Sequence, residues 1–379
     1  MLKIPDFVLR SDKMISTLRQ LVETESPTED RVAVNRMGAL IGAELSLLGA
    51  HVTAVSQAAT GDHYIGRWRG GSNQKGILLL CHMDTVHPMG SLDKNPCRER
   101  DGKLFGPGTQ DMKAGIAMLL VALKTLREAG QWPAWPITAL FTSDEETGSL
   151  TSRALIEKLA READLVLCLE PCLPGGELKT WRKGVGDFDI IVRGRAAHAG
   201  ASHPEGRNAI EELAHQVIAI QGMTDYEQGT TLNVGVIQGG TASNVVPSEA
   251  RATVDLRVVT QAEAERIQSK MQSLKAVLND TSIEVSGGLN RPPMPRDERM
   301  VAAFQQAQRI AERLGLRLAE GGTGGGSDAN FVAPLGIPVL DGLGAMGNGQ
   351  HTEREHVVLV SLPERAALLA ALLTGWQFS

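Results

Sequence analysis

Apolar and polar positions along residues 1–181 alternate between helical spacing and short apolar runs. KGILLLCHMD at 75–84 is a near-continuous apolar run, which is typical of a strand buried on both faces of a sheet. Residues 112–130 have the spacing of a strongly apolar helix that would end at Gly130, with Pro133 just beyond. The same criteria predict helices at 18–26, 31–49 and 152–162 and strands at 51–58, 63–70, 136–143 and 164–171. Strands that alternate with helices in this way predict a mostly parallel sheet flanked by helices.

The pattern changes near residue 182 to alternating strands and amphipathic helices. The predicted elements follow the order strand, helix, strand, strand, helix, strand, at 184–196, 208–220, 230–240, 249–259, 261–278 and 282–288. This β-α-β-β-α-β order is that of a ferredoxin-like α+β module with a four-stranded sheet. An open sheet leaves edges that must be covered, and pairing with a second copy of the chain is one solution. We therefore expect residues 182–289 to form an inserted domain that pairs in a homodimer.

The α/β pattern resumes after the proline-rich segment at 292–296. Helices are predicted at 298–315, 328–336 and 362–376, and strands at 316–321 and 338–344. The expected fold class is α/β, with a discontinuous larger domain at 1–181 and 290–379 that carries the α+β insertion.

Composition excludes several classes of function. The 379 residues are 42% hydrophobic and 22% charged with a formal net charge of −6, an ordinary profile for a globular protein. No block of Lys and Arg stands out, so no nucleic-acid partner is expected. No stretch approaches the roughly 20 apolar residues of a membrane span, and the N-terminus lacks the pattern of a secretory signal. Together with a content of four cysteines, these features predict a cytoplasmic protein without a membrane partner.

Acidic and histidine side chains stand where two of the apolar runs stop. ILLL is followed by His82 and Asp84, and ITALF is followed by Asp144, Glu145 and Glu146. Open α/β sheets keep their binding sites at the carboxyl ends of strands. An imidazole combined with carboxylates suits divalent metals, zinc above all. The pattern therefore predicts a metal hydrolase.

Six motifs in chain order resemble those of a known family. They are HMDTVHP at 82–88, GPGTQDMKAG at 106–115, TSDEETG at 142–148, LEP at 169–171, GRAAHAG at 194–200 and a late histidine after a glycine-rich run. With this set the chain resembles the co-catalytic di-zinc aminoacylase/carboxypeptidase superfamily of metallopeptidases, most of all its glutamate carboxypeptidase branch. The resemblance implies a zinc-exopeptidase-like catalytic domain at 1–181 and 290–379 and a lid and dimerisation domain at 182–289.

The same resemblance implies two Zn²⁺ ions per subunit, with Co²⁺ and Mn²⁺ as the alternatives. Its metal ligands in this chain would be His82, Asp111, Glu146, Glu170 and His351. Asp111 would bridge the two metals and precede a cis peptide bond. Asp84 would orient the imidazole of His82 from outside the ligand set.

The resemblance also implies roles for residues that do not bind metal. Glu145 would be the general base, which takes a proton from water and passes it to the leaving nitrogen. In the lid, His198 would reach a neighbouring subunit's site and steady the oxyanion, with Asn244 assisting. Arg257 would grip a substrate carboxylate with its fixed fork of donors, and the glycine-rich loop around Gly325 would offer backbone N–H groups to the same carboxylate.

Taken alone, each residue also has a structural interpretation. Asp111 can cap the helix behind it, and the acidic run at 144–146 can be a solvated turn. HTEREHVVLV offers two histidines for the last ligand: His351 follows the glycine-rich loop and is preferred, whereas His356 enters an apolar strand. The ordered set of motifs favours the metal site over these structural interpretations.

The function expected from the sequence is cleavage of an amide bond beside a free carboxylate. The first hypothesis is a carboxypeptidase that releases a C-terminal amino acid, such as glutamate, from small peptides or N-acyl amino acids. The second is an N-acyl amino acid deacylase of the acetylornithine deacetylase or succinyl-diaminopimelate desuccinylase type. A hypothesis of another class is a non-catalytic metal-binding or peptide-binding homologue, which would be free to lose Glu145.

Overall fold

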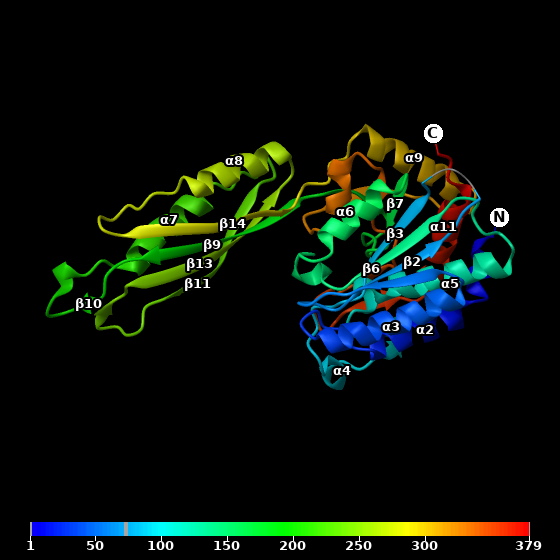
Figure 1. Cartoon of the computed structure of the whole chain (residues 1–379), viewed down its shortest axis with the longest axis horizontal. Helices are drawn as coiled ribbons and strands as arrows, with labels where there is room; N and C mark the ends of the chain where they lie inside the picture. Colours follow the sequence, from blue (N-terminus) through cyan, green and yellow to red (C-terminus); the bar gives the residue numbers. More distant parts are fainter. Residues whose placement is uncertain (1, 72–74, 379) are drawn as a thin grey trace. The chain divides into compact units, whose positions relative to one another are not determined.

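The computed structural model describes residues 2–71 and 75–378. Two compact units make up this part of the chain (Figure 1). The first contains residues 2–181, 296–322 and 327–378, and the second contains Arg182–Pro295 and Thr323–Gly326. Each unit has its own hydrophobic core.

The first unit is built on a six-stranded sheet in the order β1-β2-β6-β3-β7-β16. These strands are β1 (His51–Val55), β2 (His63–Trp68), β3 (Ile77–His82), β6 (Ile137–Thr142), β7 (Leu165–Cys168) and β16 (Val339–Leu340). The pairs β6–β3, β3–β7 and β7–β16 are parallel, whereas β1–β2 and β2–β6 are antiparallel. The α/β class and the mostly parallel sheet are thus confirmed, with an antiparallel edge.

Helices cover both faces of this sheet (Figure 1). They include α2 (Ser11–Glu23), α3 (Arg31–Leu47), α5 (Ala114–Glu128), α6 (Arg153–Arg161), α9 (Glu298–Glu312) and α11 (Ser361–Gly375). Most side chains of α5 are buried, because this helix packs against both α2 and α11. A helix that is apolar nearly all round is expected at such a place. Shorter helices are α1 (Ile4–Val8), α4 (Ser91–Lys94) and α10 (Ala329–Val332).

A small antiparallel sheet brings together two segments that lie far apart in the sequence. Its order is β17-β18-β5-β4, from β4 (Arg98–Arg100), β5 (Lys103–Phe105), β17 (Gly347–Asn348) and β18 (His356–Val358). His356 is directly opposite Phe105, so the chain after β5 runs beside the loop between β17 and β18. A further pair joins β8 (Leu178–Arg182) to β15 (Glu320–Thr323).

The second unit contains an antiparallel sheet in the order β11-β13-β9-β14. The strands are β9 (Gly184–Arg193), β11 (Thr231–Gly239), β13 (Glu249–Val258) and β14 (Ser282–Arg291), joined by the helices α7 (Ala209–Gln221) and α8 (Gln261–Gln272). This is the ferredoxin-like arrangement expected from the order of elements along the sequence. The short strands β10 (Ala197–His198) and β12 (Val245–Val246) pair outside the main sheet. Among the described residues of both units, no helix combines the length and apolarity needed to span a bilayer.

Candidate metal centre

The site lies where three parallel strands of the first unit end. β3 ends at His82, with β6 and β7 paired on either side of it. Because these three strands are parallel, the segments that follow them leave the sheet at the same edge. Those segments carry Asp84 after β3, Glu145 and Glu146 after β6, and Glu170 after β7.

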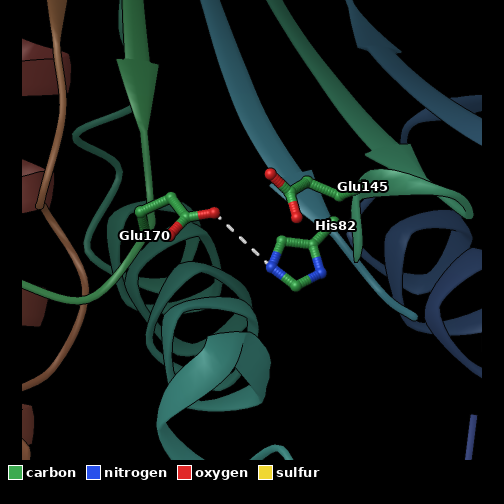
Figure 2. Close-up of side chains that lie close together, drawn as sticks. All are labelled: His82, Glu145 and Glu170. Atoms are coloured by element: carbon green, nitrogen blue, oxygen red, sulfur yellow. Dashed lines mark ion pairs between the residues drawn. The ribbon is translucent and has the colours of Figure 1, made fainter. Parts of the chain in front are cut away.

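One group of side chains consists of His82, Glu145 and Glu170. One possible ligand atom from each lies within 4.8 Å of those from the other two. Nε2 of His82 is 3.5 Å from Oε1 of Glu170. Figure 2 shows the carboxylates of Glu145 and Glu170 turned toward one another beside the His82 imidazole. The predicted base therefore lies next to two of the predicted ligands.

A second group shares His82 with the first and extends to Asp111, Glu146 and His351. Candidate ligand atoms of His82, Asp111 and Glu146 all lie within 4.8 Å of one another. Nε2 of His82 is 3.0 Å from Oδ1 of Asp111. On the other side, Nε2 of His351 is 3.5 Å from Oδ2 of Asp111 and 3.3 Å from Oε2 of Glu146. The two oxygens of Asp111 thus face different histidines, as a bridging carboxylate would.

The charges of these side chains influence one another at short range. Burial raises the pKa of Glu146 to about 7, although His351 partly opposes this. The carboxylates of Asp111 and Glu146 raise the pKa of His351 to about 10. Burial opposes ionisation of Asp111, yet hydrogen bonds from His351 and His82 hold its pKa well below the ordinary value. For His82, burial would lower the pKa, but Asp111, Asp84 and Glu170 raise it well above the ordinary value.

These donors fit a divalent metal. Two imidazoles and several carboxylates converge, which is a donor set that suits zinc and its first-row neighbours. Oε1 of Glu146 is buried and has no hydrogen-bond partner within the described part of the chain. Such an atom is costly unless a ligand satisfies it, and a cation at this place would do so.

Asp84 organises the loop that carries Glu145 and Glu146. Its carboxylate accepts the hydroxyl of Thr28 at 2.8 Å and the backbone N–H groups of Glu145 at 3.3 Å and Glu146 at 3.2 Å. Nδ1 of His82 is 3.1 Å from the carbonyl oxygen of Asp84 and 3.6 Å from its carboxylate. Asp84 therefore contacts His82 through both its backbone and its side chain.

Asp111 lies in an irregular turn, Thr109–Lys113, just before α5, and the Asp111–Met112 peptide bond is cis. Two residues near it were not singled out in the sequence. Gln350 donates to Oδ2 of Asp111 at 3.1 Å, and Glu355, fully buried, accepts the backbone N–H of Asp111 at 2.9 Å. Their short distance along the chain from His351 was the only available signal.

His356, the alternative ligand, is held elsewhere. Its Nδ1 is 2.9 Å from the carbonyl oxygen of Arg354, and its ring packs on Phe105 with centroids 5.0 Å apart. His351 is the histidine that faces Asp111 and Glu146.

The predicted lid residues all belong to the second unit. His198 and Asn244 lie close together, because β10 pairs with β12 and the carbonyl of Asn244 accepts the N–H of Ala199 at 2.9 Å. Nδ1 of His198 accepts the N–H groups of Gly200 and Ala201, both at 3.0 Å. The ring proton therefore lies on Nε2, where it can be donated outward.

Arg257 and the loop of Gly325 meet at another part of the second unit. Arg257 donates to the Asp255 carboxylate at 2.7–3.1 Å and to the carbonyl of Gly324 at 3.3 Å. The N–H of Gly325, which the sequence assigns to a substrate carboxylate, donates to the hydroxyl of Thr323 at 3.2 Å.

Comparison with known proteins gives one family and several relatives that match most of the chain. The profile of "Peptidase family M20/M25/M40" matches residues 78–375. Carboxypeptidase G2 of Pseudomonas sp. (strain RS-16) is 34% identical over 369 residues, which cover 95% of this chain and 88% of that protein. Succinyl-diaminopimelate desuccinylase of Verminephrobacter eiseniae is 32% identical over 309 residues, which cover 76% of this chain and 75% of the relative.

Solved structures share the fold along nearly the whole chain. The aminopeptidase PepT of Bacillus cereus has a TM-score of 0.77 at 25% identity and covers 96% of this chain, with 98% of its own length matched.

Proposed function

The chain belongs to peptidase family M20/M25/M40, and from this premise we propose that it is a carboxypeptidase that cleaves an amide bond beside a free carboxylate. It is a metal-dependent peptidase or amidohydrolase, as its relatives and fold establish. The specific proposal is release of a C-terminal amino acid, such as glutamate, from a small peptide or an N-acyl amino acid. Similarity to a carboxypeptidase over 95% of the chain favours this activity.

We propose two Zn²⁺ ions per subunit, with Co²⁺ and Mn²⁺ as alternatives. The ligands proposed for them are His82, Asp111, Glu146, Glu170 and His351. When bound, divalent ions at such a site polarise a carbonyl oxygen and lower the pKa of water. The donor set and the unpartnered Oε1 of Glu146 support this assignment.

Glu145 is proposed as the general base. The observation that carries this role is its position beside His82 and Glu170, within 4.8 Å of candidate ligand atoms of both. From there its carboxylate can take the proton of the attacking water and deliver it to the leaving nitrogen, a contribution of about 10²–10⁴ in rate. Asp84 helps to fix this position, because it accepts the backbone N–H of Glu145.

The second unit is proposed to recognise substrate. Arg257 and the N–H groups of the loop at Gly325 would bind the free carboxylate of the substrate. To do so, the guanidinium of Arg257 must donate to both Asp255 and the substrate carboxylate. The N–H of Gly325 must also donate to a substrate oxygen in place of the Thr323 hydroxyl. His198 would donate Nε2–H to the oxyanion, assisted by Asn244.

We further propose that the protein is a homodimer joined through the second unit. β11 is an edge strand of that unit's sheet, and Val236 and Ile237 on it are 51% and 55% exposed. An exposed edge with apolar side chains favours pairing with another strand. The cytoplasmic location stays a prediction from the sequence.

The second candidate function is an N-acyl amino acid deacylase. Its support is the 32% identity to a succinyl-diaminopimelate desuccinylase over 309 residues. The same metal ligands and base would serve it, so the two functions differ only in the groups on either side of the scissile bond.

A substrate panel tests these proposals, with the metal content measured on the same samples. The panel contains N-acyl-glutamate, other N-acyl amino acids, N-acetylornithine, N-succinyl-diaminopimelate and unblocked dipeptides. Wild-type protein is compared with E145A before and after treatment with a chelator. We expect metal-dependent cleavage of N-acyl-glutamate, with kcat lowered by about 10²–10⁴ in E145A while its metal content is unchanged.

Other results would change the assignment. Cleavage confined to the acetylated or succinylated diamino acids would replace the carboxypeptidase with the deacylase. Bound metal without turnover of any compound would mean that the catalytic proposal is wrong and that the chain is a binding protein.

A further inference from the structure

Glu355 is a buried carboxylate next to the backbone of the proposed ligand Asp111, and its side chain is not exposed to solvent. Oε1 accepts the backbone N–H groups of Gln110 and Asp111 at 2.8 and 2.9 Å. Oε2 accepts the backbone N–H of Gly108 at 2.8 Å and lies 2.7 Å from Nε2 of His87. Each oxygen thus has two donors, which uses the full acceptor capacity of a carboxylate.

These contacts join two chain segments that each carry a proposed ligand. Three of the four donors belong to residues 108–111, at the beginning of the irregular turn that carries Asp111. Glu355 itself lies four residues after His351, on the loop between β17 and β18. The carboxylate therefore ties the backbone of Asp111 to the segment that presents His351.

The other proposed ligands do not depend on this tie. His82 is the last residue of β3, and Glu170 follows β7, so the central sheet positions both. Glu146 lies on the turn that Asp84 holds through its backbone N–H. Only Asp111 and His351 come from the two segments that Glu355 connects.

We propose that Glu355 is a positioning residue that sets the affinity of the metal position formed by Asp111, Glu146 and His351. The proposal rests on the proposed function, since it presupposes two metal positions. Glu355 acts through the backbone of Asp111 and touches neither metal nor substrate. Losing the buried carboxylate leaves several N–H groups without an acceptor, so the turn must move and carry Asp111 away from His351.

Glutamine is the informative substitution at this position. It keeps one carbonyl oxygen, which can still accept two N–H groups, but its NH₂ group would face donors where Oε2 now accepts Gly108 and His87. The matched control is E353Q, which removes the same charge from an exposed position of the same loop.

The experiment is a titration of metal-free protein with Co²⁺ alone, followed by calorimetry and by visible absorption. We expect wild type and E353Q to bind two ions. In E355Q, the ion held by His351 should bind about 10- to 100-fold more weakly, the range typical of residues that orient metal ligands. The other ion shares only Asp111 with the two tied segments, so its affinity should fall by a smaller factor. Excess Co²⁺ should restore kcat in E355Q, with KM for substrate near the wild-type value.

The Co²⁺ affinities of E355Q decide whether Glu355 is a positioning residue. Two ions bound by E355Q with wild-type affinity would overturn the inference. Equal weakening of both ions would also overturn it, because the effect would not be larger for the ion held by His351. If E355Q does not fold, H87A decides. It removes only the His87 contact to Oε2 and leaves the one from Gly108, so it should weaken the same ion by a smaller factor. Failure of wild type to bind two ions would instead refute the proposed function, so the two failures are distinguishable.

Discussion

Single buried carboxylates at the metal centre each organise several backbone groups. Asp84 accepts two N–H groups of the turn that carries the proposed base, and Glu355 accepts three from the turn that carries Asp111. Hydrogen bonds to a charged acceptor contribute about 1.5–3 kcal/mol each, and the loss of a buried partner costs more than the loss of an exposed one. Asp84 thereby holds the turn of Glu145 and Glu146 next to the end of β3, and Glu355 holds the turn of Asp111 next to the loop that carries His351.

At the residue scale, the structure predicts different effects for the two late histidines. H351N should weaken one metal by more than about 100-fold, because it removes a ligand, whereas loss of a residue that merely orients a ligand costs 10- to 100-fold. H356N should leave both affinities within a factor of about three, well below that range. The measurement is metal content after dialysis against a weak chelator.

The opposite ranking would identify His356 as the ligand and would contradict the geometry. His356 contacts Arg354 and Phe105, so its replacement is expected to affect stability before metal binding. Unfolding curves of both variants would separate the two effects.

At the scale of elements, the end of α8 shows what the sequence pattern could not indicate. Amphipathic spacing predicted a helix over 261–278, but α8 ends at Gln272. Beyond it, the N–H groups of Val277 and Leu278 donate to the carboxylate of Glu212, at 3.0 and 2.7 Å for Oε2. Glu212 is buried on α7, so a tertiary contact replaces the last helical hydrogen bonds.

Glu263, a carboxylate on α8, should make the stability of the protein depend on pH. Arg266, with the hydroxyl of Thr230, lowers the pKa of Glu263 to about 2. Because the pKa of Glu263 is lower in the folded protein than its ordinary value of 4.5, its ionised carboxylate stabilises the fold fully above about pH 4.5. This contribution is lost as the pH falls through about 2. E263Q should therefore lower the free energy of unfolding at neutral pH by roughly 0.5–1 kcal/mol, the discounted range for a solvated pair. Below about pH 2 the variant and wild type should become equal.

Urea unfolding followed over this pH range tests the prediction. E227Q is the matched control, because Glu227 is exposed and lies in the turn just before Thr230. A difference between E263Q and wild type that stayed constant down to the lowest pH would show that the side chain acts through packing and not through its charge.

At the scale of the whole molecule, the second unit presents two sets of polar groups far apart. Arg257 pairs with Val185 near the start of β9, whereas His198 follows the end of β9 at Arg193. At about 3.3 Å per residue, the two ends of this strand are roughly 25 Å apart. Figure 1 shows β10, which carries His198, at one end of the sheet of this unit. One small substrate cannot contact both residues of the same copy, so His198 is expected to act in a partner's site.

A mixing experiment tests this arrangement. E145A and H198A should each be nearly inactive, but dimers that contain one subunit of each should have one complete site. An equal mixture that exchanges subunits freely should recover about one quarter of the wild-type activity, since half the dimers are mixed and half of their sites are intact. The measurement is the hydrolysis rate after co-refolding, compared with each variant alone.

Recovery of no activity, in a mixture shown by mass spectrometry to contain mixed dimers, would mean that His198 acts within its own subunit. Absence of any dimer in sedimentation would reject the homodimer itself.

The sequence by itself determined the architecture and which residues could carry the chemistry. Continuous apolar runs ending in His82 and before Glu145 predicted buried parallel strands, because hydrophobic period and strand-end position are local properties of the chain. The change of pattern near residue 182 likewise predicted the ferredoxin-like insertion, since the order of elements is written along the sequence.

Only the tertiary structure decided which groups meet. Glu355 and Gln350 reach the turn of Asp111 because β18 pairs with β5, two strands separated by about 250 residues of chain, and loop closure over such distances leaves no local pattern. The left-handed backbone of His351, with φ of 60°, aims this histidine at Asp111 while His356 turns to Phe105. Buried polar contacts of this kind depend on partners distant in sequence, and those partners are fixed only when the chain is folded.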